Sequence, residues 1–100
     1  METRRILNNH RGYLDVAYLR LQDGQTINKS FDEADGLNTP YVVIYDQKQP
    51  VAASRLRIED GIGAIEKITS LEGYDEKETL IKASTSWLND LGIREYKILN

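Results

Sequence analysis

The feature that most constrains the fold is a series of β-forming segments joined by very short connections. Residues 41–45 are all β-branched or aromatic, which is typical of a strand. Two further segments, 51–58 and 62–69, have strand-like composition, and only residues 46–50 and 59–61 separate the three. Connections this short join antiparallel neighbours. We therefore predict a three-stranded antiparallel meander.

A helix and a last strand are predicted after the meander. Between about residues 76 and 91, one helical stripe holds residues 80, 84, 87, 88 and 91. Gly92 stands just past it, the usual place for a left-handed C-terminal cap. Residues 96–99 form the last predicted strand. Because strand–helix–strand connections are right-handed crossovers, we expect this strand to lie parallel to the third strand of the meander.

The N-terminal part predicts one more helix and a long loop. From Tyr13, apolar residues recur with the spacing of one helical face, at Leu14, Ala17, Tyr18 and Leu21. Residues 5–7 are compatible with a short edge strand. Residues 23–39 are polar and interrupted by glycine and asparagine, which predicts a loop. Loops of this length in compact domains are often functional.

Together these elements predict a single domain over residues 1–100 with an α+β fold. The meander leads through the crossover helix to the parallel final strand, and the N-terminal helix packs against the sheet. A chain of 100 residues has room for one such core. The expected core residues are Leu14, Tyr18, Val43, Leu56, Ile65, Ile68, Leu80, Ile81, Ser84, Trp87, Leu88 and Ile98.

The composition excludes several classes of function. The sequence has no cysteine and one histidine, His10, which rules out disulfide scaffolds, zinc–thiolate centres, thiol nucleophiles and multi-histidine metal sites. It has no apolar run long enough to cross a membrane, and its charged start does not resemble a secretion signal. A net charge of −3 weighs against nucleic-acid binding. We expect a cytoplasmic protein without a metal site, a membrane partner or a nucleic-acid partner.

The start of the second helix is a candidate anion site. A helix N-terminus presents free backbone N–H groups and the positive end of the helix dipole. Phosphate-binding loops also need glycines and positive charge. Here Gly73 is the only glycine in residues 71–79, and Lys77 is surrounded by Glu72, Asp75, Glu76 and Glu78. The alternative is that these acids only stabilise the helix dipole.

From Tyr18 to Asn100 the chain resembles the GNAT superfamily of N-acetyltransferases, in particular the branch with a phenylalanine-aspartate-x-x-aspartate element. The stretches that match, in the same order, are residues 31–35, 41–46, 49–57, 65–71, 87–93 and 96–100. The resemblance implies a GNAT-like mixed sheet. It also implies acetyl-coenzyme A as cosubstrate, bound between two splayed parallel strands. The acetyl group would pass by direct attack to an amine acceptor, a small molecule or a peptide.

The resemblance also implies roles for individual residues. The strand matching residues 65–71 holds the pantetheine arm through its backbone, with Ile68, Thr69 and Ser70 nearest the contact. Glu66 occupies the position of a glutamate that in some members deprotonates the amine, usually through water. Lys77, Glu78 and Thr79 fall where the family binds the pyrophosphate. For Glu66 the alternative is a structural ion pair with Arg55 or Arg57.

The sequence departs from the family pattern in two places. The pyrophosphate loop normally contains glycines and an arginine or glutamine, whereas residues 75–79 are largely acidic. Like charges about 4 Å apart cost roughly 1 kcal/mol even in water. Family members also continue, after the strand matching residues 96–99, into a helix and two strands. Those elements carry the tyrosine usually assigned as general acid.

These departures leave two functional hypotheses. One is an acetyltransferase domain with weak or absent activity. The other is a non-catalytic GNAT-like module that acts through protein contacts. Since an exposed strand edge around Ile98 invites pairing with another chain, we expect a homodimer or a strand-donating partner.

Overall fold

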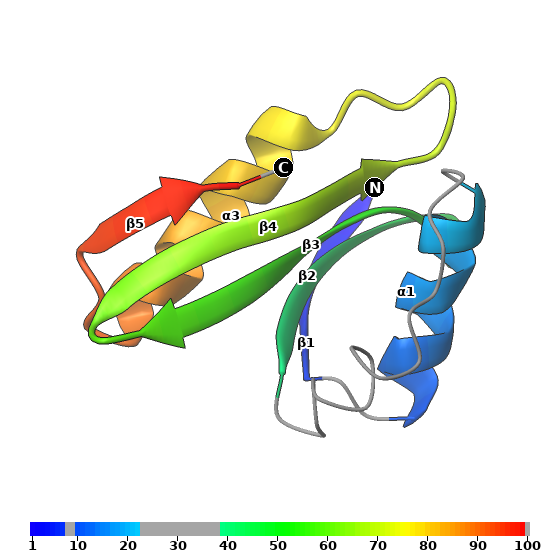
Figure 1. The fold of residues 1–100 in the computed structure, drawn as a ribbon. Helices are drawn as coiled ribbons and strands as arrows, with labels where there is room; N and C mark the ends of the chain where they lie inside the picture. Colours follow the sequence, from blue (N-terminus) through cyan, green and yellow to red (C-terminus); the bar gives the residue numbers. More distant parts are fainter. Residues whose placement is uncertain (8–9, 23–38, 100) are drawn as a thin grey trace.

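The computed structural model describes residues 1–7, 10–22 and 39–99. Within them a five-stranded sheet has the order β1-β2-β3-β4-β5, and its neighbours are antiparallel except for the parallel pair β4 and β5 (Figure 1). The elements are β1 (Glu2–Leu7), α1 (His10–Gln22), β2 (Pro40–Asp46), β3 (Gln49–Glu59), β4 (Ile62–Ser70), α3 (Lys77–Asp90) and β5 (Glu95–Ile98). The predicted α+β fold, with its meander, crossover helix and parallel last strand, is confirmed. Residues 5–7 belong to the longer edge strand β1.

Both hairpin turns of the meander are built from two residues with left-handed backbone. Gln47 and Lys48 have φ angles of 51° and 69°, and Asp60 and Gly61 have 54° and 77°. Two central residues with positive φ match the twist of the flanking strands, which keeps β2, β3 and β4 in register. Gly92 also has a positive φ, 82°, and ends α3 as the sequence predicted.

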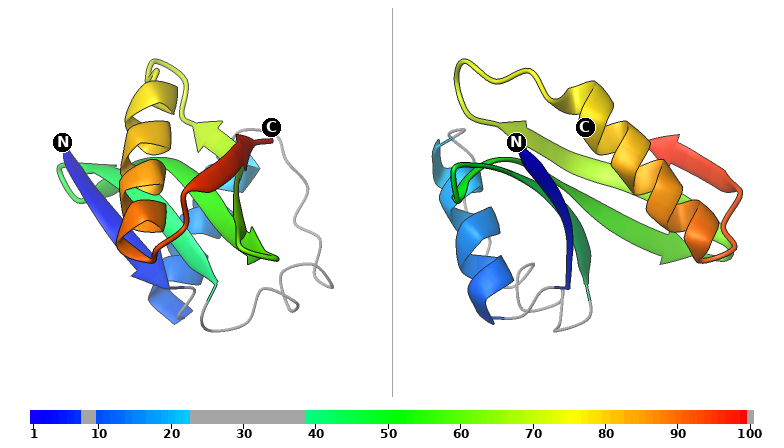
Figure 2. Two further views of the ribbon diagram at one scale, coloured as in Figure 1. Left: turned by 90° about the vertical axis from the view of Figure 1, so that its left-hand side faces the viewer. Right: turned by 180° about the vertical axis from the view of Figure 1, so that it is seen from behind.

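Helices α1 and α3 cover opposite faces of the sheet (Figure 2). On one face, Val16 and Leu19 of α1 pack against Tyr41, Val43 and Tyr45. Residues of β2 alternate between faces, so Val42 and Ile44 point the other way and pack against Leu80 of α3. Further along α3, Leu88 packs with Leu56 and Ile65.

The predicted buried face of α1 was wrong. Leu14 and Tyr18 are 53% and 40% exposed, whereas Val16 and Leu19 face the sheet. The buried side of the helix also carries polar groups: Arg20 is buried, and the Asp15 carboxylate accepts a 2.6 Å hydrogen bond from the Tyr45 phenol. A helix that meets the sheet partly through polar partners cannot be oriented from its apolar spacing alone.

The rest of the predicted core is largely confirmed, with one exception. Ile98 is 42% exposed, because β5 is an edge strand of the described sheet. Three predicted core residues, Ile68, Ile81 and Trp87, are only partly buried against the clusters of α3. The fully buried members of the prediction are Val43, Leu56, Ile65, Leu80, Ser84 and Leu88.

Some predictions lie outside the described residues. These include the loop 23–39 apart from Thr39, and with it the phenylalanine-aspartate element at 31–35. Of the helices in the described ranges, none has the length and apolar character needed to cross a membrane. No three acidic or histidine side chains of those ranges gather as metal ligands.

Candidate active site on the central strands

β4 and β5 run side by side only over the first part of β4. Residues 62–65 pair with residues 95–98, and the Leu99 N–H then donates to the Ile65 carbonyl at 2.8 Å. Beyond that point β4 continues through residues 66–70 without a β5 partner among the described residues, and Figure 1 shows it extending past the end of β5. Pairing between the two parallel strands therefore ends in the middle of β4, at Ile65.

A β-bulge lies just beyond the point where the pairing with β5 ends. On the β3 side, Thr69 pairs with Ala53 but Glu66 pairs with Arg55, so that Lys67 and Ile68 together face the single residue Ser54. Lys67 takes a left-handed φ of 53°, which is unusual for a residue other than glycine. A bulge bends its strand and strengthens the local twist, so we expect β4 to bend here, just beyond the last residue that pairs with β5.

The loop between β4 and α3 is fastened to the hairpin of β2 and β3. The Leu71 N–H donates to the Val51 carbonyl at 2.8 Å, and the Tyr74 phenol donates to the Asp46 carboxylate at 2.8 Å. This hydrogen bond, together with partial burial and the Asp46 charge, raises the pKa of the Tyr74 phenol above its ordinary value. These two hydrogen bonds fix the position of the loop and therefore the position at which α3 begins.

The first turn of α3 has no side-chain cap. Glu76 precedes the helix and makes no side-chain hydrogen bond to its N–H groups, while its carbonyl accepts from the Leu80 N–H at 2.9 Å. The predicted cofactor-binding residues Lys77, Glu78 and Thr79 form this turn, and all three are exposed. The other three candidates lie on the part of β4 beyond its pairing with β5, where Thr69 is buried and Ile68 and Ser70 are half-buried.

Glu66 lies between two arginines on the sheet face opposite α3. Its carboxylate is 3.4 Å from Arg55 Nε and 3.6 Å from an Arg57 amino nitrogen, and its side chain is 13% exposed. These distances are at or beyond the limit of a good hydrogen bond, so the contacts are chiefly electrostatic. The ion pair raised as the alternative for Glu66 is present in the structure.

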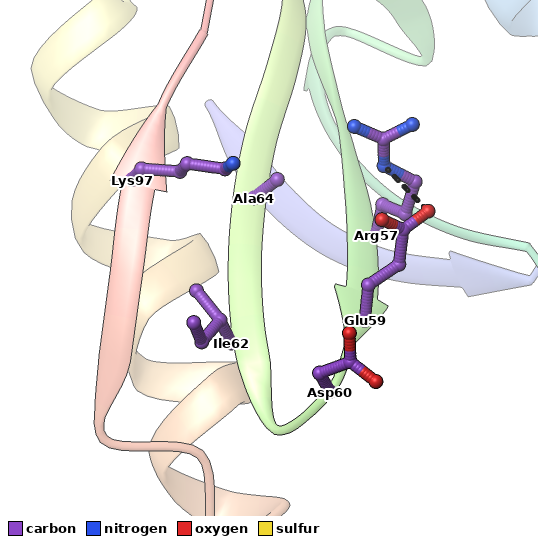
Figure 3. Close-up of a pocket in the computed structure, with 6 residues that line it drawn as sticks. All are labelled: Arg57, Glu59, Asp60, Ile62, Ala64 and Lys97. Carbon is purple, nitrogen blue, oxygen red and sulfur yellow. Dashed lines mark ion pairs between the residues drawn. The ribbon is translucent and has the colours of Figure 1, made fainter.

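A hollow of about 150 Å³ lies on the same face, next to this ion-pair cluster (Figure 3). Three strands and the β3–β4 turn supply its lining. Figure 3 shows Lys97 extending from β5 to the near edge of β4, toward Ala64. The lining residues are Arg57, Glu59, Asp60, Ile62, Ala64 and Lys97.

Sequence reasoning named Arg57 only as a partner of Glu66 and missed the rest of the hollow. The two-residue period places positions 55, 57 and 59 on one face of β3, and 62, 64 and 66 on one face of β4. Lys97 joins them because it pairs with Ala64. The register between β4 and β5 depends on how the intervening helix α3 packs, and no local sequence pattern indicates it.

No established family profile matches the sequence, and no curated protein matches it. Solved structures do match. The ribosomal-protein-S18-alanine N-acetyltransferase from Escherichia coli has a TM-score of 0.77 at 9% identity, over 97% of this chain and 66% of that protein. The chain has the GNAT fold.

Two more GNAT-fold structures support this assignment. A GNAT-family acetyltransferase from Streptococcus pneumoniae has a TM-score of 0.70 at 17% identity, over 98% of this chain and 72% of its own. AAC(6')-Iy, solved with a bisubstrate analogue of coenzyme A, has a TM-score of 0.73 at 15% identity, over 98% and 79%. At these identities the likeness establishes the fold.

Proposed function

We propose that this chain is a GNAT-type N-acetyltransferase domain that binds acetyl-coenzyme A weakly and passes the acetyl group to an amine. The observation that carries the proposal is the stretch of β4 after Ile65, residues 66–70, which has no β5 partner among the described residues and leads through a short loop to the uncapped start of α3. A structure with the same fold was solved with a coenzyme A bisubstrate analogue, which supports this choice of cosubstrate.

The two ends of the cosubstrate fit the chain unequally. The pantetheine arm carries amides that can hydrogen-bond along a strand, and residues 68–70 of β4, which have no β5 partner among the described residues, offer their backbone. The pyrophosphate would rest on the N–H groups of residues 77–79, where the helix dipole favours an anion. Asp75, just before α3, and Glu78, in its first turn, are exposed and negatively charged. Their repulsion of the pyrophosphate offsets much of the binding energy that the helix dipole and Lys77 contribute.

Glu66 is the proposed base. The amine nitrogen attacks the thioester carbonyl, so that a C–N bond forms and the C–S bond breaks. The proton of the amine passes to the Glu66 carboxylate through a water molecule. Coenzyme A leaves as a thiolate and takes a proton from solvent. In this scheme Arg55 and Arg57 hold the carboxylate in position on the sheet face.

Removing negative charge around the start of α3 should strengthen the binding of acetyl-coenzyme A. We expect the double variant Asp75→Asn, Glu78→Gln to bind acetyl-coenzyme A about tenfold more tightly than the unaltered chain, because two like charges are lost near the pyrophosphate. Isothermal titration calorimetry measures both affinities. Glu95→Gln, at the start of β5, is the control and should leave the affinity unchanged. An unaltered affinity in the double variant would refute this explanation of weak binding.

A non-catalytic module remains the second candidate, and one observation favours it. β5 exposes Tyr96 and Ile98 along an edge of the described sheet, which suits contact with another protein. If neither the unaltered chain nor the double variant gives heat with millimolar acetyl-coenzyme A, the acetyltransferase proposal fails. Sedimentation velocity over a range of concentrations would then report self-association through this edge.

A further inference from the structure

We infer that the acceptor of this protein carries an anionic group beside its amine, and that Lys97 binds this group in the hollow of Figure 3. The inference rests on the proposed acetyl transfer and adds the substrate class. A carboxylate and a phosphate share the chemistry that Lys97 would recognise, and the experiment below separates them.

Lys97 is the available cation of the hollow. No ion pair or hydrogen bond engages its ammonium group within the described residues, whereas Arg57 is already paired with Glu59 at 3.7 Å and with Glu66 at 3.6 Å. A lysine on a strand edge often serves to prevent pairing with other chains. Lys97 instead extends inward to the near edge of β4, where the small side chain of Ala64 leaves space for it (Figure 3).

The position of Lys97 relative to Glu66 defines the spacing of the two groups. Lys97 pairs with Ala64, and Glu66 follows Ala64 by two residues on the same face of β4. Two residues of extended strand cover about 7 Å. An acceptor lying along β4 would therefore place its amine at Glu66 and its anionic group at Lys97, with Ile62 and Ala64 as an apolar floor.

The opposite arrangement is less favourable. Asp60 lies at the turn end of the hollow and would attract a cation there. An amine bound at Asp60 would stand on the far side of Lys97 from Glu66, out of reach of the base. The order of Asp60, Lys97 and Glu66 along β4 therefore favours an acceptor whose anionic group lies at Lys97 and whose reacting amine lies at Glu66.

The test uses matched probes that differ only in charge. The acids glycine, 4-aminobutyrate and 6-aminohexanoate are compared with the corresponding amides, and 3-aminopropyl phosphate serves as the phosphate arm. NMR titration of the chain gives affinities without acetyl-coenzyme A, and thiol release gives kcat and KM. We expect 4-aminobutyrate to bind roughly tenfold more tightly than its amide, and more tightly than glycine. A stronger response to the phosphate would identify that anion as the preferred group.

Variants assign the effect to one side chain. Lys97→Met should abolish the preference for acid over amide and raise the KM for the acid about tenfold, with kcat and the affinity for the amide unchanged. Lys97→Arg should restore the preference, and Lys82→Met, on the exposed side of α3, should behave as the unaltered chain. Equal binding of acid and amide by the unaltered chain, or a preference retained in Lys97→Met, would overturn the inference. Loss of acetyl-coenzyme A binding alone would refute the proposed function and leave the NMR preference intact.

Discussion

Gly63→Ala is expected to lower the free energy of unfolding by about 1–3 kcal/mol, an overpacking cost. A Cβ at position 63 would stand 2.6 Å from Leu88 Cδ1 and 2.9 Å from its Cδ2. Leu88 is fully buried against Leu56 and Ile65, so we expect its side chain to move aside only by disturbing these contacts. Gly63 is thus required by the close approach of α3 to β4.

The cause can be isolated with a second substitution. Leu88→Ala alone should cost about 2–5 kcal/mol, but it also opens the space that an added methyl group at position 63 needs. In the Leu88→Ala background, Gly63→Ala should change the free energy of unfolding very little, which would reveal a large coupling between the two neighbouring residues. Leu80→Ala is the control, because Leu80 packs in a different cluster and its effect should simply add. Urea unfolding followed by circular dichroism measures the three single variants and the two double variants. An unchanged cost of Gly63→Ala in the Leu88→Ala background would contradict the packing described here.

Glu66→Gln is expected to reduce kcat for acetyl transfer by about 10²–10⁴, the usual contribution of a general base. The amide keeps the size of the carboxylate but cannot accept the amine proton. Thiol release during acetylation of 4-aminobutyrate measures the rate. Glu2→Gln is the control, since Glu2 also pairs with an arginine but is exposed on β1 and does not line the hollow.

Measuring the stability of the Glu66→Gln variant separates a catalytic role of Glu66 from a structural one. Glu66→Gln removes a partner from Arg55, which is buried, and should therefore destabilise the chain as well. If kcat stays within threefold while the free energy of unfolding falls, Glu66 acts only as the partner of the two arginines. A fall in kcat in protein that remains folded supports the base.

Most of the fold follows from local patterns. The connections of the meander are too short for anything but antiparallel hairpins, and the stripe around Leu80 and Leu88 faces the sheet as predicted. The face of α1 was not predictable, because Asp15 and Arg20 on its buried side interrupt the apolar signal. Hydrophobic spacing orients a helix only where the interface is apolar throughout.

The geometry around Glu66 was foreseen in part. The family resemblance singled out Glu66, and the ion pair with Arg55 or Arg57, left open as the alternative for this residue, is present. The bulge at Lys67 could not be predicted, because its left-handed residue is a lysine and no glycine marks the position. Lys97 enters the hollow through a register between β4 and β5 that only the packed crossover defines. These features depend on contacts between segments distant in sequence.

The most direct measurement is a titration of the whole chain with acetyl-coenzyme A, followed by the amide resonances in NMR spectra. We predict saturable changes concentrated at residues 66–70, the part of β4 beyond its pairing with β5, and at residues 77–79, where α3 begins. The amide resonances of β1 and of the last turn of α3 should not shift. Spectra that remain unchanged at millimolar acetyl-coenzyme A, or that change only away from these two segments, would contradict a cosubstrate site at the end of β4 and the start of α3.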